Sequence, residues 1–199
     1  MKIVVPMRDN EDLRYDTKGI ETIIIKNSDC IHPYGHIFFA ELGKLFTFIE
    51  TERFYECLNT NETIAFMQNR RYFTNFDKLN VKDDEVIMAK SLYFRISLEK
   101  QFKYGHSNAT YLFDQVMQAI NAPDELINSP LCCFHNIFIM KADNVKKYCE
   151  FVKPILNDIF KEEYKEKFGA YLAERIFWMW CKINLNIIQE DFTELSKLY

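Results

Sequence analysis

Two adjacent arginines, Arg70 and Arg71, follow an apolar run at Thr63 to Met67. A guanidinium group carries a fixed charge and forked donors, which suit the oxygen atoms of a diphosphate or a sugar phosphate. Successive side chains of an extended segment point in opposite directions, so we expect only one of the two to face a bound phosphate. The alternative is a solvated turn, because arginine is common on protein surfaces.

His135 and Asn136 interrupt the most apolar run of the chain, Leu131 to Met140. Polar groups buried in such a run cost a few kcal/mol unless they are hydrogen-bonded. The neighbouring backbone or a ligand hydroxyl would satisfy them equally well, and both interpretations stay open. His106 lies in a predicted loop and is a weaker candidate, because the default there is an exposed histidine without a role.

Glu174 and Arg175 begin a segment that is otherwise almost entirely apolar. At 100° per residue Glu174 lies about 200° from Leu172, and it therefore points away from the inward stripe of a helix. That predicted stripe consists of Leu172, Ile176, Met179 and Ile183. The carboxylate of Glu174 is either an end residue favoured by the helix dipole, or a general base or sugar ligand that faces a site.

Several enzyme classes lose their simplest support, because GxGxxG, GxxxxGK[ST], GxSxG and HExxH are all absent from the sequence. The six cysteines form no CxxC pair and offer no ligand spacing for zinc. The first residues, MKIVVPMRDN, contain too short an apolar run for a secretory signal. We therefore interpret the cysteines as reduced core residues of a cytoplasmic protein.

The chain has 199 residues, of which 48% are hydrophobic and 16% aromatic, and its formal net charge is −4. This composition can bury a sizeable core and excludes disorder. The mildly acidic balance favours no nucleic acid as a partner. The longest apolar runs are far shorter than the roughly 20 residues of a transmembrane segment, although peripheral association with a membrane stays open.

Strands alternate with helices along the chain, which indicates an α/β sandwich in a single domain over residues 1–199. Short apolar runs predict strands at Ile3 to Val5, Ile23 to Ile25, Thr63 to Met67, Val86 to Ala89 and Leu131 to Met140. Apolar positions three and four residues apart predict helices at Gly35 to Glu50 and at Tyr171 to Ile183. The same spacing predicts a helix that ends at Ile120 and is capped by Ser107 or Asn108. A further helix is predicted from a cap at Asp143 to Phe160, with a kink at Pro154.

Four segments together resemble a known family in their order and approximate spacing across residues 36–184. They are FFAELGKLFTFIE at Phe38 to Glu50, NRRYF at Asn69 to Phe73, HNIFIMKADNVKKYCEF at His135 to Phe151, and YLAERI at Tyr171 to Ile176. The family is domain-of-unknown-function family 4422, which occurs in capsular and exopolysaccharide synthesis proteins and is assigned to glycosyltransferases. Glu41 stands at the glutamate that the family shares.

This resemblance implies a GT-A-like nucleotide-diphospho-sugar transferase fold, with a mostly parallel central sheet flanked by helices and the donor at the carboxyl edge of that sheet. GT-A enzymes hold a divalent cation with an Asp-x-Asp motif, whereas the comparable strand end here reads Gln68, Asn69, Arg70. The acidic metal ligands of that motif are therefore missing from this sequence, the dependence on a divalent metal stays open, and the arginine pair could replace the charge of the metal. The candidate donor-binding residues are Asn69, Arg70, Arg71, His106 and Asn136, with Asn136 on the sugar.

The same resemblance nominates Glu174 as the catalytic base or as a ligand of the acceptor. The expected function is a cytoplasmic glycosyltransferase that moves a sugar from a nucleotide-diphosphate donor, UDP before other nucleotides, to a glycan or lipid-linked acceptor of a surface polysaccharide. The alternative is a non-catalytic or degenerate partner protein of the same fold. A nuclease-like enzyme is disfavoured, because the sequence offers no carboxylate cluster for two metals.

Overall fold

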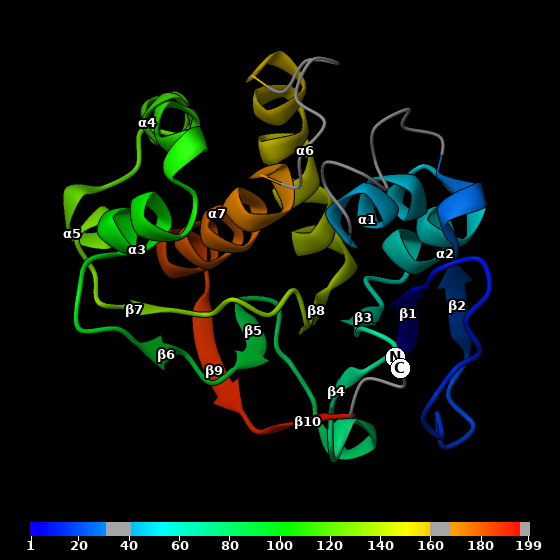
Figure 1. The fold of residues 1–199 in the computed structure, drawn as a ribbon. Helices are drawn as coiled ribbons and strands as arrows, with labels where there is room; N and C mark the ends of the chain where they lie inside the picture. The colour runs from blue at the N-terminus through cyan, green and yellow to red at the C-terminus, as the bar shows by residue number, and fades with distance from the viewer. Residues whose placement is uncertain (31–40, 160–167, 196–199) are drawn as a thin grey trace.

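A central sheet of six strands organises the computed structural model, which describes residues 1–30, 41–159 and 168–195 (Figure 1). Its strands lie in the order β2 (Thr22–Ile25), β1 (Lys2–Pro6), β3 (Thr63–Phe66), β8 (Phe138–Lys141), β5 (Glu85–Ala89) and β9 (Asn186–Glu190). β1 pairs in parallel with β2 and β3, and β5 pairs in parallel with β9. Only β8 pairs antiparallel within this sheet, with β3 on one side and β5 on the other. The fold is α/β with a mixed, mostly parallel sheet, as predicted.

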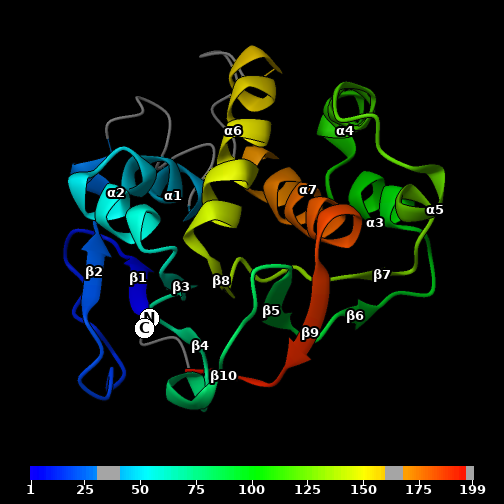
Figure 2. The same ribbon diagram turned by 180° about the vertical axis from the view of Figure 1, so that it is seen from behind.

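Helices flank the sheet, and Figures 1 and 2 show α1 (Glu41–Ile49), α2 (Glu52–Asn59), α6 (Ala142–Ile159) and α7 (Phe168–Asn184) side by side over the central strands. Beyond α7 lie α3 (Leu98–Gly105), α4 (Thr110–Ala119) and α5 (Asp124–Ile127). Three short 3-10 turns are Asn27–Asp29, Phe76–Lys78 and Ser107–Ala109. Within the described residues, no helix is long and apolar enough to cross a membrane.

Two small antiparallel ribbons complete the fold. β4 (Arg71–Phe73) pairs with β10 (Phe192–Glu194), and β6 (Leu92–Tyr93) pairs with β7 (Leu131–Cys132). The first ribbon joins the segment that follows β3 to the segment that follows β9. It therefore brings two parts of the chain together that are far apart in the sequence.

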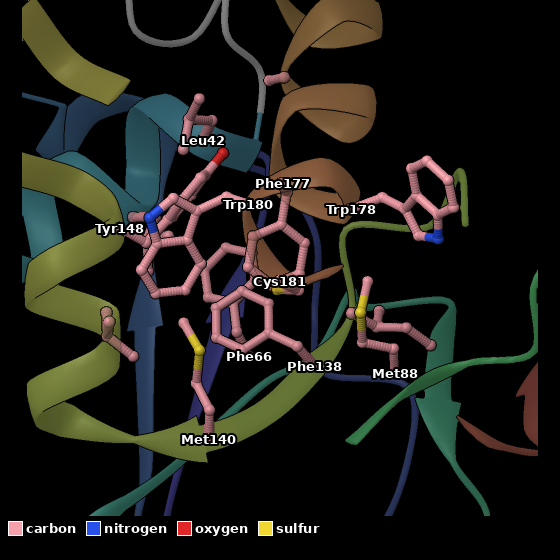
Figure 3. Close-up of a cluster of buried hydrophobic side chains, with 14 of the residues drawn as sticks. Leu42, Phe66, Met88, Phe138, Met140, Tyr148, Phe177, Trp178, Trp180 and Cys181 are labelled. Atoms are coloured by element: carbon pink, nitrogen blue, oxygen red, sulfur yellow. The ribbon is translucent and has the colours of Figure 1, made fainter. Parts of the chain in front are cut away.

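A series of aromatic rings joins the sheet to α6 and α7 (Figure 3). Phe66 of β3 stacks on Phe138 of β8, with 5.3 Å between the ring centroids. Phe177 of α7 lies 4.8 Å from Phe138 and 4.9 Å from Tyr148 of α6. All four side chains are buried. Because buried aromatic rings remove a large apolar area from water, these contacts fix α7 on the sheet.

The strand directions place several chain segments at one edge of the sheet, which we call the carboxyl edge. The carboxyl ends of β1, β2 and β3 share it, because these strands are parallel. Phe138, the first residue of β8, pairs with Phe66, the last residue of β3, so the residues that precede β8 lie there too. β5 and β9 run parallel to β3 and end at the same edge, at Ala89 and Glu190.

The prediction of one strand from Leu131 to Met140 is wrong. The chain forms β7 in the outer ribbon and β8 in the central sheet, with irregular backbone at residues 133–137. The reason is that the two halves pair with different strands, β6 and β3, so the chain has to change sheets between them. His135 and Asn136 therefore lie just before a strand and not within one.

Two predicted helix caps are also wrong. The residue before α4 is Ala109, which makes no side-chain cap, and residues 107–109 form a 3-10 turn instead of a cap at Ser107 or Asn108. Asp143 lies inside the first turn of α6, which begins at Ala142. Pro154 lies within α6 as predicted. Residues 35–40 and 160 of the predicted helices lie outside the described residues.

The predicted inward stripe of α7 is correct for Leu172, Ile176 and Met179, which are all buried. Ile183 is 57% exposed, so the prediction fails at this position. The physical reason is its place in the last turn, where the exposed neighbours Lys182 and Asn184 show that the helix extends past the core.

This contrast gives a matched pair of variants within one helix. We expect Ile176→Ala to lower the free energy of unfolding by about 2–5 kcal/mol, because it opens a cavity in the core. Ile183→Ala should change it by no more than about 0.5 kcal/mol, as exposed substitutions usually do. Urea denaturation of both variants measures the difference, and equal losses would contradict the placement of α7.

Candidate functional site

The strand order of the central sheet reverses at β1, and such a reversal is a common position for ligands in α/β sheets. The chain runs from β1 to β2 on one side and returns to β3 on the other side. In α/β sheets, ligands bind outside the carboxyl ends of the strands at such a point. The segments that leave β1 and β3, and the segment that enters β8, carry the polar residues described next.

The two arginines differ in how far they are already engaged. The Arg71 guanidinium donates hydrogen bonds to a Glu194 carboxylate oxygen, at 2.9 Å from Nε, and to Gln68 Oε1, at 3.2 Å from Nη1. The half-buried Arg70 side chain forms no hydrogen bond or ion pair with another described residue. Its backbone oxygen accepts a hydrogen bond from the Leu195 N–H at 2.8 Å. Arg70 is therefore the arginine whose donors are available to a ligand.

His135 and Asn136 present polar atoms that no other described residue satisfies. Asn136 is 8% exposed, and neither its Nδ2 nor the Nδ1 of His135 has a hydrogen-bond partner within the described part of the chain. Burial lowers the pKa of His135, and the nearby Arg71 lowers it further. The imidazole is thus neutral near pH 7. Unsatisfied buried polar atoms are costly, which favours the interpretation that a ligand satisfies them over a bond to the local backbone.

Glu174 lies half-buried on α7, within electrostatic range of Glu41 on α1 and Arg71 on β4. Burial raises the pKa of Glu174 to about 8, Glu41 raises it as well, and the cations Arg175 and Arg71 act against the rise. Desolvation disfavours the charged form of a carboxyl, which explains the direction. A carboxyl with such a pKa can accept or donate a proton near neutral pH.

Asn69 is buried, and its side chain is engaged within the protein. Its Oδ1 accepts a hydrogen bond from the Arg14 N–H at 3.0 Å, and its Nδ2 donates to the Asp12 carbonyl at 3.1 Å. The amide therefore ties the loop that follows β1 to the segment that follows β3. Asn69 therefore helps to hold these two segments of the candidate site together, and its own polar atoms already have partners within the protein.

His106 lies between α3 and α4 and packs against the first turn of α7. Its ring stacks on Tyr171, with 4.3 Å between centroids and 16° between planes, and lies 4.9 Å from the Phe102 ring. Burial lowers the pKa of His106, and Arg175 lowers it further. His106 therefore lies on the α3 side of α7, against Tyr171 and Phe102, and no described contact joins it to Arg70, Asn136 or Glu174.

The residues at the end of β3 do not fit a divalent cation. Gln68, Asn69 and Arg70 provide amide and guanidinium groups where carboxylate oxygens would be needed. Within the described ranges, no group of three or more His, Cys, Asp or Glu side chains stands close enough to hold a metal ion.

Glu194 is a residue of the candidate site that sequence reasoning missed. It lies 123 residues from Arg71 in the chain, and only the three-residue pairing of β4 with β10 brings them together. Arg71 lowers the pKa of Glu194 through this hydrogen bond. Strands this short leave no usable signal in the sequence.

The fold and the described residues together define an α/β protein with a candidate ligand site at the carboxyl edge of a mixed sheet. The model of the domain of unknown function DUF4422 matches residues 47–185, and the chain belongs to this family. The apo structure of WbbM, a bifunctional glycosyltransferase, is similar to the chain with a TM-score of 0.60 and 14% sequence identity. The similarity covers 98% of this chain and 45% of the WbbM chain. No curated protein matches.

The raised pKa of Glu174 predicts a pH-dependent stability. The folded state keeps this carboxyl protonated up to a pH of about 8, whereas the unfolded chain releases the proton near 4.5, so the free energy of unfolding falls as the pH rises between these values. We expect Glu174→Gln to remove this fall and to be more stable than the native chain above about pH 8, by on the order of 1 kcal/mol or more.

Denaturation between about pH 5 and pH 9 measures this effect, with Glu194→Gln as the control. The pKa of Glu194 is lowered, so this group stays ionised through the same window in both states. Parallel stability curves for the native chain and Glu174→Gln would show that Glu174 does not titrate as described.

Proposed function

We propose that the chain is a glycosyltransferase that moves a sugar from a nucleotide-diphosphate donor, with UDP as the favoured nucleotide, to a glycan or lipid-linked acceptor in capsular or exopolysaccharide synthesis. One observation carries the proposal. The available guanidinium of Arg70 and the unpartnered amide of Asn136 lie at the same carboxyl edge, and the titratable carboxyl of Glu174 is within electrostatic range of Arg71 beside them. The likeness to a glycosyltransferase fold supports it.

In this proposal the donor lies across the carboxyl ends of β1 and β3. Arg70 donates charge-assisted hydrogen bonds to the diphosphate, and Arg71, held by Glu194, adds positive potential. The Asn136 amide donates a hydrogen bond to a hydroxyl of the sugar. Because guanidinium groups stand where carboxylates would hold a cation, binding of the donor does not depend on a divalent metal.

Glu174 acts as the general base in the transfer. The bond from the sugar anomeric carbon to the diphosphate oxygen breaks, a bond to the acceptor oxygen forms, and the proton of the acceptor hydroxyl passes to the Glu174 carboxylate. With a pKa of about 8, this carboxylate is ionised in roughly one molecule in ten at pH 7. The diphosphate leaves with both electrons of the broken bond, and Arg70 stabilises its charge.

We further propose that residues 1–199 act as one catalytic domain in the cytoplasm. All six cysteines are free thiols, and five of them are buried, which is usual in a reducing compartment. The rival proposal is a non-catalytic partner protein of the same fold. The two differ in donor turnover, because a degenerate copy could bind a nucleotide but would not release UDP from a UDP-sugar.

A thermal-shift screen tests the donor site. We expect UDP and UDP-sugars to raise the melting temperature, with and without manganese, and a chelator to leave the shift unchanged. Arg70→Ala should weaken UDP binding by more than about 1.5 kcal/mol, since it removes a hydrogen bond to a charged group. The exposed Arg53 provides the control variant Arg53→Ala. No shift with any common nucleotide would overturn the donor site, and a shift that needs metal would overturn the role of the arginines.

Release of UDP from UDP-sugars tests the role of Glu174. Glu174→Gln keeps the volume and removes the base, so turnover should fall by about 10² to 10⁴ while UDP affinity changes little. The native rate should rise as the pH approaches about 8, where the carboxylate becomes ionised. The exposed Glu125 of α5 supplies the control Glu125→Gln. Near-normal turnover in Glu174→Gln would remove Glu174 from the mechanism.

A further inference from the structure

Lys44 of α1 is a buried cation that makes no ion pair with another described residue. Its side chain is 6% exposed, and within the described part of the chain its ammonium group forms no salt bridge or hydrogen bond. The other buried charged side chain in that part is Arg175, whose guanidinium bonds to the Tyr171 carbonyl at 2.5 Å and to Gln101. An uncompensated buried charge is destabilising, so Lys44 calls for a partner outside the described contacts.

The surroundings of Lys44 place it on the β1 and β2 side of the candidate site. Cys30, Glu41 and Asp9 are all close enough to act on its charge. Asp9 follows the end of β1, and Cys30 follows the 3-10 turn after β2, so both belong to the carboxyl edge. Glu41 lies one turn before Lys44 on α1, and its charge also raises the pKa of Glu174. Lys44 therefore lies at the same edge of the sheet as Arg70. It lies on the β2 side of β1, whereas Arg70 follows β3 on the other side of β1.

Within the described residues, none of the nearby carboxylates forms a salt bridge with Lys44. The Asp9 carboxylate accepts a hydrogen bond from the Ser28 N–H at 2.8 Å and makes no salt bridge with Lys44. Burial is the largest influence on Lys44 and lowers its pKa, and the surrounding acidic groups only oppose this effect. The buried ammonium group of Lys44 is thus suited to an additional anion.

Resting on the proposed function, we propose that Lys44 binds a phosphate oxygen of the nucleoside-diphosphate donor. A diphosphate carries several negative charges, and Arg71 already shares its charge with Glu194. Arg70 alone would leave the diphosphate undercompensated, so a second available cation completes the site. A lysine ammonium is a compact point charge that suits a phosphate oxygen.

Calorimetric titration with UDP, UMP and uridine tests this assignment. Lys44→Met keeps the length of the side chain and removes the charge, and Lys44→Gln is made in parallel in case the first variant does not fold. We expect UDP to bind about 10-fold or more weakly to both variants, whereas uridine binds as it does to the native chain. Without ligand, the melting temperature should stay the same or rise, because an uncompensated buried charge is gone.

Lys182→Met is the matched control, since Lys182 is exposed in the last turn of α7 and its loss lowers the net charge equally. If both Lys44 variants bind UDP like the native chain, the assignment of Lys44 is wrong while the proposed function stands. A marked loss of melting temperature in both variants makes Lys44 a structural residue and also overturns the assignment. If the native chain binds neither UDP nor UMP, the proposed function itself fails.

Discussion

The antiparallel strand β8 is the constraint on which the sheet depends. It lies between β3 and β5 and supplies the hydrogen bonds that join the half formed by β2, β1 and β3 to the half formed by β5 and β9. Because β8 runs against its neighbours, the chain enters it at the carboxyl edge. One strand direction thus joins the two halves of the sheet and places His135 and Asn136 at the candidate site.

Arg175 holds the segment that enters β8 in place. Its guanidinium lies 4.6 Å from the Phe134 ring and 5.0 Å from the Phe102 ring, and it bonds to Gln101 of α3. A buried cation is stabilised by aromatic faces and by hydrogen bonds when no ion pair is available. Since Phe134 directly precedes His135, and Glu174 directly precedes Arg175, one side chain couples the positions of both candidate residues.

Sequence reasoning identified the central strands β1, β3 and β5 because each is a short apolar run with both faces covered, and it identified the edge strand β2 from its β-branched residues. It also identified α7 and nominated Glu174, Arg70 and Asn136, which the structure brings to one region. It failed where the outcome depends on distant pairing. The break at residues 133–137 follows from the choice of partner strands, and Glu194 reaches Arg71 only through β10. Lys44 lies in an apolar helix, and its pattern alone does not reveal a buried charge.

The hydrogen bonds of Asn69 have a consequence for the entropy of binding. Together with the stack of Tyr15 on Tyr72, at 4.4 Å, and the ion pair of Lys18 with Asp77, they fasten the loop after β1 to the segment after β3. Both segments at this part of the carboxyl edge are therefore held in place before any ligand arrives. A ligand that binds there loses little free energy to the freezing of loops, so more of its contact energy remains as affinity.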